Sequence, residues 1–218
     1  MKKIVAFALT CALLIGVAGC GKKDSFKKES DNLIKAAEQA CGAQEASDKQ
    51  KEAFLNDPDE EVSNTFENGA YFTLSSDDIK SFADESIYDV DEIKDMLCFM
   101  KYDGMTSCGS YVFGFKNTKS AEKYYKQMTS AWKSVEDSIV KMAEKNEDFS
   151  YAFSSEDNEF VLAELNGDDN DAMVLYYRLD GNTLTTIVYS GALNSDLYSE
   201  LLDLFKEGDY CDLESLLK

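Results

Sequence analysis

The most regular pattern in the chain is a series of four short apolar runs in its C-terminal half. They cover residues 149–153, 160–165, 173–179 and 183–189, and turn-forming residues separate them. The last break is Asp180-Gly181-Asn182, and Asp-Gly between two apolar runs is a strong hairpin signal. The pattern therefore predicts a four-strand antiparallel meander.

A helical stripe precedes this meander. Apolar residues recur every three or four positions between residues 118 and 145, at Ala121, Tyr124, Tyr125, Met128, Trp132, Val135, Ile139 and Met142. This spacing predicts one long helix with Asn117 as its N-cap. Its aromatic face could line a ligand groove or pack on a sheet, and the spacing favours packing.

The remaining elements are shorter. Residues 26–55 read as helix interrupted near Gly42, and residues 91–100 as a further helix. Residues 69–74 and 111–115 read as strands, and Ser75 and Asp78 have the spacing of a capping box. The segment 194–196 caps a last helix, whose expected inner residues are Leu197, Leu201, Leu204 and Phe205.

These elements alternate helix and strand before ending in hairpin-linked strands. Short hairpin connections favour antiparallel pairing over parallel crossovers. We therefore expect an α+β fold, with a mainly antiparallel sheet, the C-terminal four-strand meander, and helices packed on one face.

The first twenty residues carry the pattern of an exported protein. Lys2 and Lys3 precede an apolar run over residues 4–17, shorter than the about 20 residues that a membrane-spanning helix needs. The run ends in Val17-Ala18-Gly19-Cys20, which resembles the lipobox of bacterial lipoproteins. The resemblance implies a signal peptide over residues 1–19, cleavage before Cys20 and a covalent lipid on its sulfur. An ordinary signal peptide with a chance cysteine is the alternative.

Residues 20–28 follow as an expected anchor and tether. They hold four lysines and one aspartate, which suits either contact with anionic headgroups or a solvated linker. Residues 29–218 are then expected to form a single extracytoplasmic domain, held on the membrane by the lipid. Arg178 is the only arginine beside many lysines, which indicates an AT-rich genome and a Gram-positive host.

The chain is strongly acidic, and this excludes one class of partner. Its net charge is −20, and loss of Lys2 and Lys3 with the signal peptide makes it −22. Such a surface repels nucleic acid, so no nucleic-acid partner is expected. Hydrophobic residues make up 44% of the chain, enough for a packed core.

Four cysteines remain beyond Cys20. Export to an oxidising compartment favours disulfides, and four cysteines allow three pairings. Cys98 with Cys108 is the favoured pair because a turn separates them, which leaves Cys41 with Cys211. Buried free thiols are the alternative. A zinc site is not expected, because the chain has no histidine.

Little in the sequence indicates catalysis. The absence of histidine removes Ser-His and Cys-His nucleophile pairs. The one metal candidate is the loop over residues 166–171, where Asp168, Asp169 and Asp171 offer oxygen ligands for Ca²⁺. It departs from the EF-hand pattern in its glycine position and lacks the closing glutamate, so a polar hairpin turn is the favoured interpretation and no metal is expected.

Three function classes follow. A non-enzymatic module that binds a small-molecule ligand or a protein fits every feature of the sequence. An envelope hydrolase with a Ser/Lys site is the alternative, and a structural or immunity-type partner of a basic protein is the third. No other cofactor than the lipid on Cys20 is expected.

Overall fold

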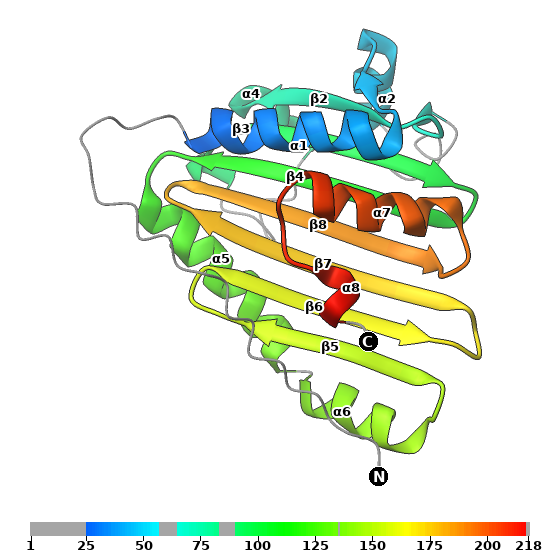
Figure 1. The fold of residues 1–218 in the computed structure, drawn as a ribbon. Coiled ribbons are helices and arrows are strands. Elements are labelled where there is room, and N and C mark those ends of the chain that lie inside the picture. The colour runs from blue at the N-terminus through cyan, green and yellow to red at the C-terminus, as the bar shows by residue number, and fades with distance from the viewer. Residues whose placement is uncertain (1–24, 57–64, 83–89, 135, 217–218) are drawn as a thin grey trace.

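One eight-stranded sheet forms the centre of the protein. The computed structural model describes residues 25–56, 65–82, 90–134 and 136–216, so the signal peptide and Cys20 lie outside the described residues. The strand order is β1-β2-β3-β4-β8-β7-β6-β5 (Figure 1). Neighbouring strands are antiparallel, except that β1 and β2 are parallel. The strands are β1 Gln44–Glu45, β2 Ala70–Ser75, β3 Ile93–Asp103, β4 Thr106–Phe115, β5 Phe149–Ser155, β6 Glu159–Asn166, β7 Asp171–Asp180 and β8 Thr183–Ala192.

Helices cover both faces of this sheet. One face carries α1, α7 and α8, and the other carries α5 (Figure 1). The α+β class and the mainly antiparallel sheet are as predicted, but the expectation that all helices pack on one face is corrected. The helical elements are α1 Ser25–Cys41, α2 Asp48–Asn56, α4 Ser76–Phe82, η1 Val90–Glu92, α5 Thr118–Lys133, α6 Glu136–Lys145, α7 Asp196–Glu207 and α8 Leu213–Leu216.

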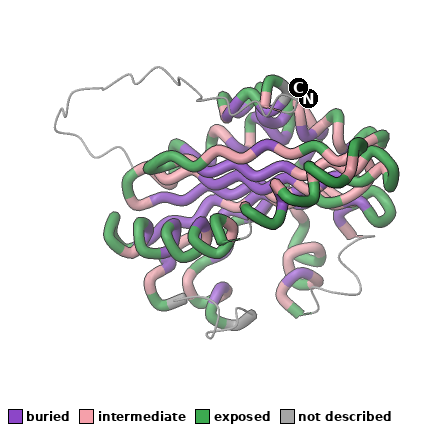
Figure 2. Tube along the Cα trace, turned by 90° about the horizontal axis from the view of Figure 1, so that it is seen from below, coloured by how far each residue is buried: buried purple, intermediate pink, exposed green. Residues whose placement is uncertain are grey.

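The second covered face follows from the strand sequences. Successive side chains of a strand point to opposite faces. In β4, Cys108 and Val112 belong to the core beneath α1 and α7, whereas Phe113 and Phe115 belong to the core beneath α5. Both sets are almost fully buried, and Figure 2 shows the buried strands enclosed by the more exposed helices. A sheet that is apolar on both faces must be covered on both.

Helix α1 lies very close to β4. A Cβ atom built on Gly114 of β4 would come within 2.9 Å of the Phe26 ring of α1. Only glycine leaves room for this contact. Leu33, Ala36 and Ala37 continue the buried stripe of α1, and the helix packs beside α7 (Figure 1).

The segment predicted as a helix over residues 91–100 is instead a strand. Residues 90–92 form the short helix η1, and β3 begins at Ile93. The pairing of β3 with β4 shifts register between Ile93 and Asp95. This irregularity places Ile93 and Met96 in the same core, so their three-residue spacing imitates a helix.

The C-terminal meander and the helix caps agree with the predictions. Strands β5 to β8 follow one another as antiparallel neighbours. The Asn117 side chain accepts a hydrogen bond from the Ser120 N–H, and Ser195 caps α7 in the same way. The long predicted helix is divided, because α5 ends at Lys133 and α6 begins at Glu136. Among the described residues, no helix is both long and apolar enough to cross a bilayer.

The expected boundary between tether and domain also shifts. Helix α1 begins at Ser25, so residues 25–28 belong to a helix. Lys27 lies on this helix and forms an ion pair with Asp31 one turn later, with its Nζ atom 2.7 Å from Oδ2. Both side chains are exposed, so the pair adds little stability.

Candidate functional site

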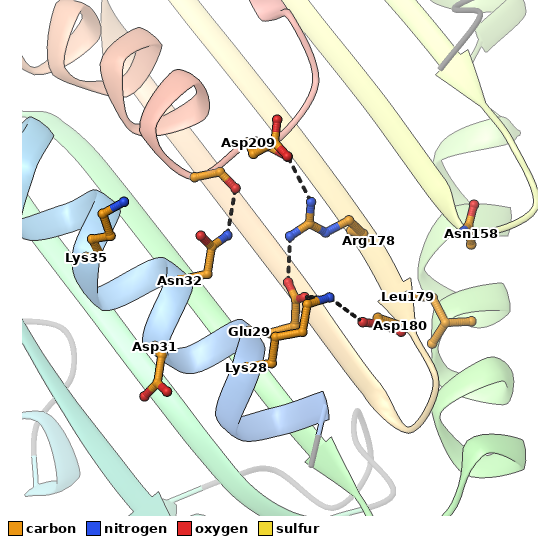
Figure 3. Close-up of a pocket in the computed structure, with 11 residues that line it drawn as sticks. Lys28, Glu29, Asp31, Asn32, Lys35, Asn158, Arg178, Leu179, Asp180 and Asp209 are labelled. Carbon is orange, nitrogen blue, oxygen red and sulfur yellow. Dashed lines mark hydrogen bonds and ion pairs between the residues drawn. The ribbon is translucent and has the colours of Figure 1, made fainter. Parts of the chain in front are cut away.

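A polar pocket lies where α1 faces the end of β7. Its volume is about 540 Å³. The first three turns of α1 form one wall, and the ends of β7 and α7 form the others (Figure 3). Its lining residues are Lys28, Glu29, Asp31, Asn32, Lys35, Asn158, Arg178, Leu179, Asp180, Gly208 and Asp209.

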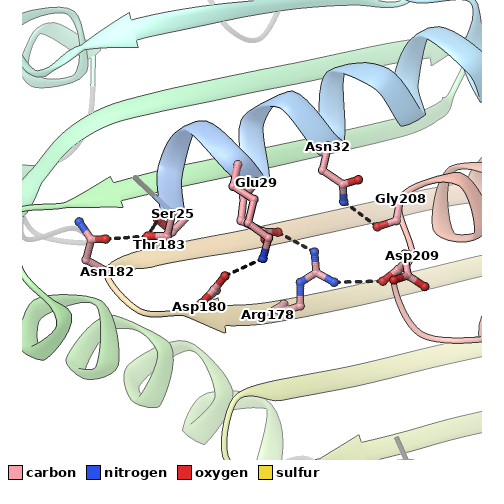
Figure 4. A network of polar contacts seen from close by, with 10 residues as sticks. Ser25, Glu29, Asn32, Arg178, Asp180, Asn182, Thr183, Gly208 and Asp209 are labelled. Carbon is pink, nitrogen blue, oxygen red and sulfur yellow. Dashed lines mark hydrogen bonds and ion pairs between the residues drawn. The ribbon is translucent and has the colours of Figure 1, made fainter. Parts of the chain in front are cut away.

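An ion pair between α1 and β7 forms the floor of the pocket. Arg178 donates from Nη2 to Oε2 of Glu29 over 2.5 Å (Figure 4). The Glu29 side chain is 3% exposed and the Arg178 side chain 22%. Burial alone lowers the pKa of Arg178, but the neighbouring Tyr176 and Glu29 outweigh it and raise the pKa. The guanidinium therefore remains charged.

The guanidinium of Arg178 has two further partners. Its Nη1 atom donates to the carbonyl oxygen of Asp209 over 3.1 Å. Its Cζ atom lies 4.6 Å from the centre of the Tyr210 ring, within the range of a cation–π contact. Arg178 thus holds α1 and the segment after α7 against β7.

Two more side chains of α1 contribute to this junction. The Nζ atom of Lys28 lies 3.1 Å from Glu29 and 3.0 Å from Asp180 at the end of β7. The hydrogen bond to Asp180 is the largest cause of the raised pKa of Lys28. Asn32 donates to the carbonyl oxygen of Gly208 over 2.6 Å. The pocket wall is therefore held together by charged and polar contacts (Figure 4).

Charged and polar side chains make up most of the pocket lining. Among the described residues that line it, there is no serine, threonine or cysteine, the usual nucleophiles of hydrolases. Lys35, Asn158 and the Asp209 side chain are exposed at its rim and offer donors and acceptors to a polar ligand.

The cysteines do not form the expected bridges. Cys41, Cys98 and Cys108 are buried thiols, which leaves the pairs Cys98–Cys108 and Cys41–Cys211 unformed. Cys98 faces the core beneath α5, whereas Cys108 faces the core beneath α1. The two lie on adjacent strands but point to opposite faces of the sheet, so the structure does not support their pairing. Burial raises the pKa of the Cys41 thiol to about 12.

The candidate calcium loop joins β6 to β7. Asn166 donates its side-chain amide to the Asp169 carboxylate, and the charge of Asp148 raises the pKa of Asp168. Asp171 is the first residue of β7. In the described ranges, no three acidic or cysteine side chains lie close enough together to hold a metal ion.

Sequence reasoning missed the pocket and its ion pair. Glu29 and Arg178 are separated by 149 residues and meet only in the folded chain. Two signals were present. Arg178 is the single arginine, and Glu29 lies one helical turn before Leu33, on the stripe that becomes buried. A carboxylate on an apolar face indicates a buried partner.

Comparison with known proteins finds a solved structure with a weakly similar fold. No protein-family model matches the sequence, and no curated protein matches it. Among solved structures, the chain is similar to the extracellular domain of PknH from Mycobacterium tuberculosis, with 8% sequence identity and a TM-score of 0.41. The match covers 76% of this chain and 98% of that chain. At this level the likeness concerns the course of the backbone and assigns no ligand, activity or family.

Proposed function

We propose that the protein is a membrane-anchored extracytoplasmic lipoprotein whose folded part binds a ligand or another protein without catalysing a reaction. The proposal of an anchor rests on the lipobox-like segment Val17-Ala18-Gly19-Cys20. Two or three acyl chains on Cys20 give stable membrane attachment, since each buried CH₂ group contributes about 0.8 kcal/mol.

The geometry of α1 relates this anchor to the pocket. Helix α1 starts at Ser25, five positions after Cys20, and five residues span at most about 18 Å. The pocket is lined by Lys28, Glu29 and the next two turns of the same helix. A ligand bound there would therefore lie close to the membrane surface.

The composition of the pocket supports binding over hydrolysis. Lys28 and Arg178 are paired with carboxylates, which fixes their positions and leaves a rim of exposed polar side chains. A hydrolase of the Ser/Lys class needs a serine hydroxyl within hydrogen-bond reach of a lysine amine. The described lining supplies lysines but no serine.

The anchor is tested by growing the host with a labelled fatty acid. We expect the wild-type chain to take up label and to sediment with membranes, and the Cys20→Ser variant to take up none. Cys11 lies in the same leader, so Cys11→Ser is the matched control and should label normally. Equal labelling of wild type and Cys20→Ser would refute the anchor.

The pocket is tested separately by screening small polar compounds against the mature protein for an increase in Tm. A compound that binds the pocket should lose its effect in Lys35→Glu and Asn158→Ala, both exposed substitutions. Lys133→Glu, an exposed change on α5 outside the pocket, is the control. Turnover of a screened ester or amide that survives replacement of the pocket residues would favour the hydrolase instead.

A further inference from the structure

Strand β5 ends the sheet, and its own sequence has none of the usual features that protect an edge strand. Proteins guard exposed edges with charged residues, prolines, bulges, very short strands, or a covering helix or loop. At the opposite edge, β1 has only 2 residues. By contrast, β5 has 7 residues, Phe149–Ser155, and none of them is charged or proline. The chain as a whole has 42 acidic and 22 basic residues, so an uncharged edge is a marked local exception.

The register of β5 with β6 shows which backbone groups face outward. The N–H of Gly167 donates to the Asp148 carbonyl over 2.9 Å, and the N–H of Glu156 donates to the Glu159 carbonyl over 2.8 Å. In an antiparallel pair, hydrogen-bonded residues alternate along each strand. The even-numbered residues of β5 therefore bond to β6, and the odd-numbered residues turn their N–H and C=O groups to the outer edge.

The outward-facing residues Phe149, Tyr151 and Phe153 differ in whether their backbone amides have a partner. The N–H of Phe149 donates back to the Asn146 carbonyl over 3.3 Å. Within the described parts of the chain, the amides of Tyr151 and Phe153 have no backbone partner on this side. Helix α6 contacts β5, but the backbone groups of a helix bond to one another and cannot complete a strand. The second half of β5 therefore offers a free hydrogen-bonding edge.

The side chains beside this edge are apolar on one face. Phe149, Tyr151 and Phe153 are half-buried and pack against the core beneath α5. Phe153 meets Phe160 of β6 edge to face, with ring centres 5.4 Å apart. A strand added along β5 would cover the exposed parts of these rings, which gives apolar contact beside the new backbone hydrogen bonds.

Acidic residues stand at both ends of the uncharged strand. Glu147 and Asp148 precede it, and Glu156 and Asp157 follow it, all four of them exposed. The neighbouring Asp168 has a raised pKa because of the charge of Asp148, which shows how crowded the acidic groups are at the first end. Two copies of β5 side by side would bring acidic ends together in either direction, so the charges disfavour a second copy of this chain as occupant.

We propose that the β5 edge binds an extended segment of a partner protein by strand addition, and that this segment has an uncharged, alternating apolar centre with basic residues at both ends. The free backbone of Tyr151 and Phe153 supplies the pairing, the aromatic stripe supplies apolar contact, and the acidic ends select the flanks. This inference specifies the partner class for the binding role proposed above.

The probe is a synthetic peptide of five alternating valines and threonines between two pairs of lysines, titrated into the protein purified from its host in detergent. We expect binding that weakens with added salt, and slower hydrogen exchange at the amides of Tyr151 and Phe153. A peptide with glutamates in place of lysines should bind at least about tenfold more weakly, as expected for reversed charges at both ends. Equal affinity of the two peptides would contradict the charge selection.

The backbone pairing between β5 and the peptide is tested by one change in the protein and one change in the peptide. Phe153→Pro removes one outward N–H together with the ring, and should weaken binding about tenfold more than Phe153→Ala, which removes the ring alone; the difference is the effect of about one lost hydrogen bond. Ser154→Ala, whose backbone faces β6, is the matched control. Because a proline can disturb the fold, a peptide methylated on its pairing backbone nitrogens is tested on the wild type and should bind as weakly. Unchanged binding of the methylated peptide would overturn the proposal.

Self-association is measured in the same preparation. A dimer abolished by Phe153→Pro would also overturn the proposal, since the occupant would then be a second copy. None of these outcomes bears on fatty-acid labelling of Cys20 or on ligands of the α1 pocket, so this inference and the anchoring proposal fail independently.

Discussion

The guanidinium of Arg178 in β7 donates to the carboxylate of Glu29 in α1, two residues that are 149 positions apart in the sequence. The Glu29 side chain is almost completely buried, and its charged partners are Arg178 and Lys28. The pair therefore joins α1 to the end of β7.

Arg178→Met should destabilise the protein by about 3 kcal/mol, because it leaves the buried charge of Glu29 without its main partner. The double variant Glu29→Met with Arg178→Met should recover much of this loss, since no buried charge remains. Urea unfolding of the wild type, both single variants and the double variant gives the coupling free energy. Additive losses in this cycle would contradict a direct interaction.

Asp78 should contribute to the pH dependence of stability. Its pKa is lowered, first by the hydrogen bond from the Ser75 N–H and further by Lys51. A lowered folded pKa gives stability that is present above the unfolded pKa of about 4 and is lost as pH falls through the folded pKa. Asp78→Asn should therefore cost about 0.5 kcal/mol at neutral pH, a value reduced for solvent screening, and nothing in strong acid.

Asp77→Asn is the matched control for this prediction. Both aspartates lie in the first turn of α4, but Ser75 donates to Asp78. Urea unfolding between pH 2 and pH 7 compares the two variants. An equal loss in both would assign the effect to the helix dipole and not to the capping box that the Ser75 and Asp78 spacing predicts.

The buried thiols should react slowly in the folded protein. Burial raises the pKa of Cys41 to about 12 and also raises the pKa of Cys98 and Cys108. Because the thiolate is the reactive form, an aromatic disulfide reagent at pH 8 should modify these residues only after denaturant is added. A gain in mass on reduction of the untreated protein would reveal a bridge and contradict the structure.

Gly191→Ala should destabilise the fold by about 2 kcal/mol. Gly191 has φ +144, and an added Cβ would come within 2.7 Å of the Thr106 Cα. Gly104→Asn is the control, because φ there is +60, nothing lies within 4 Å, and asparagine tolerates this conformation. Thermal unfolding should show a clear loss of Tm in the first variant and a small change in the second.

Local features of this fold were predictable from the sequence, and non-local ones were not. The hairpin at Asp180-Gly181-Asn182 and the caps at Asn117 and Ser195 depend on residues within a few positions of one another. The register shift after Ile93 reversed the alternation in β3 and concealed the strand. Which faces the helices cover depends on contacts across the whole chain.

At the candidate sites, too, local features were predictable from the sequence and non-local ones were not. The pocket depends on the meeting of Glu29 with Arg178, which no local pattern specifies. The strand character of residues 149–153 was predicted, but its place at the edge follows only from the order of strands in the sheet. The polar loop with Asp168, Asp169 and Asp171 was predicted as a turn, and it joins β6 to β7.

Packing of α1 against α7 has a consequence for the way the chain acquires its structure. Among the described elements, helix α1 is the first to be synthesised, yet the surfaces that cover its apolar stripe come from β4, β8 and α7, far along the chain. Contacts between distant segments form late and slow folding. The apolar stripe of α1 therefore stays exposed until almost the entire polypeptide has been synthesised. During that interval we expect a chaperone to bind it.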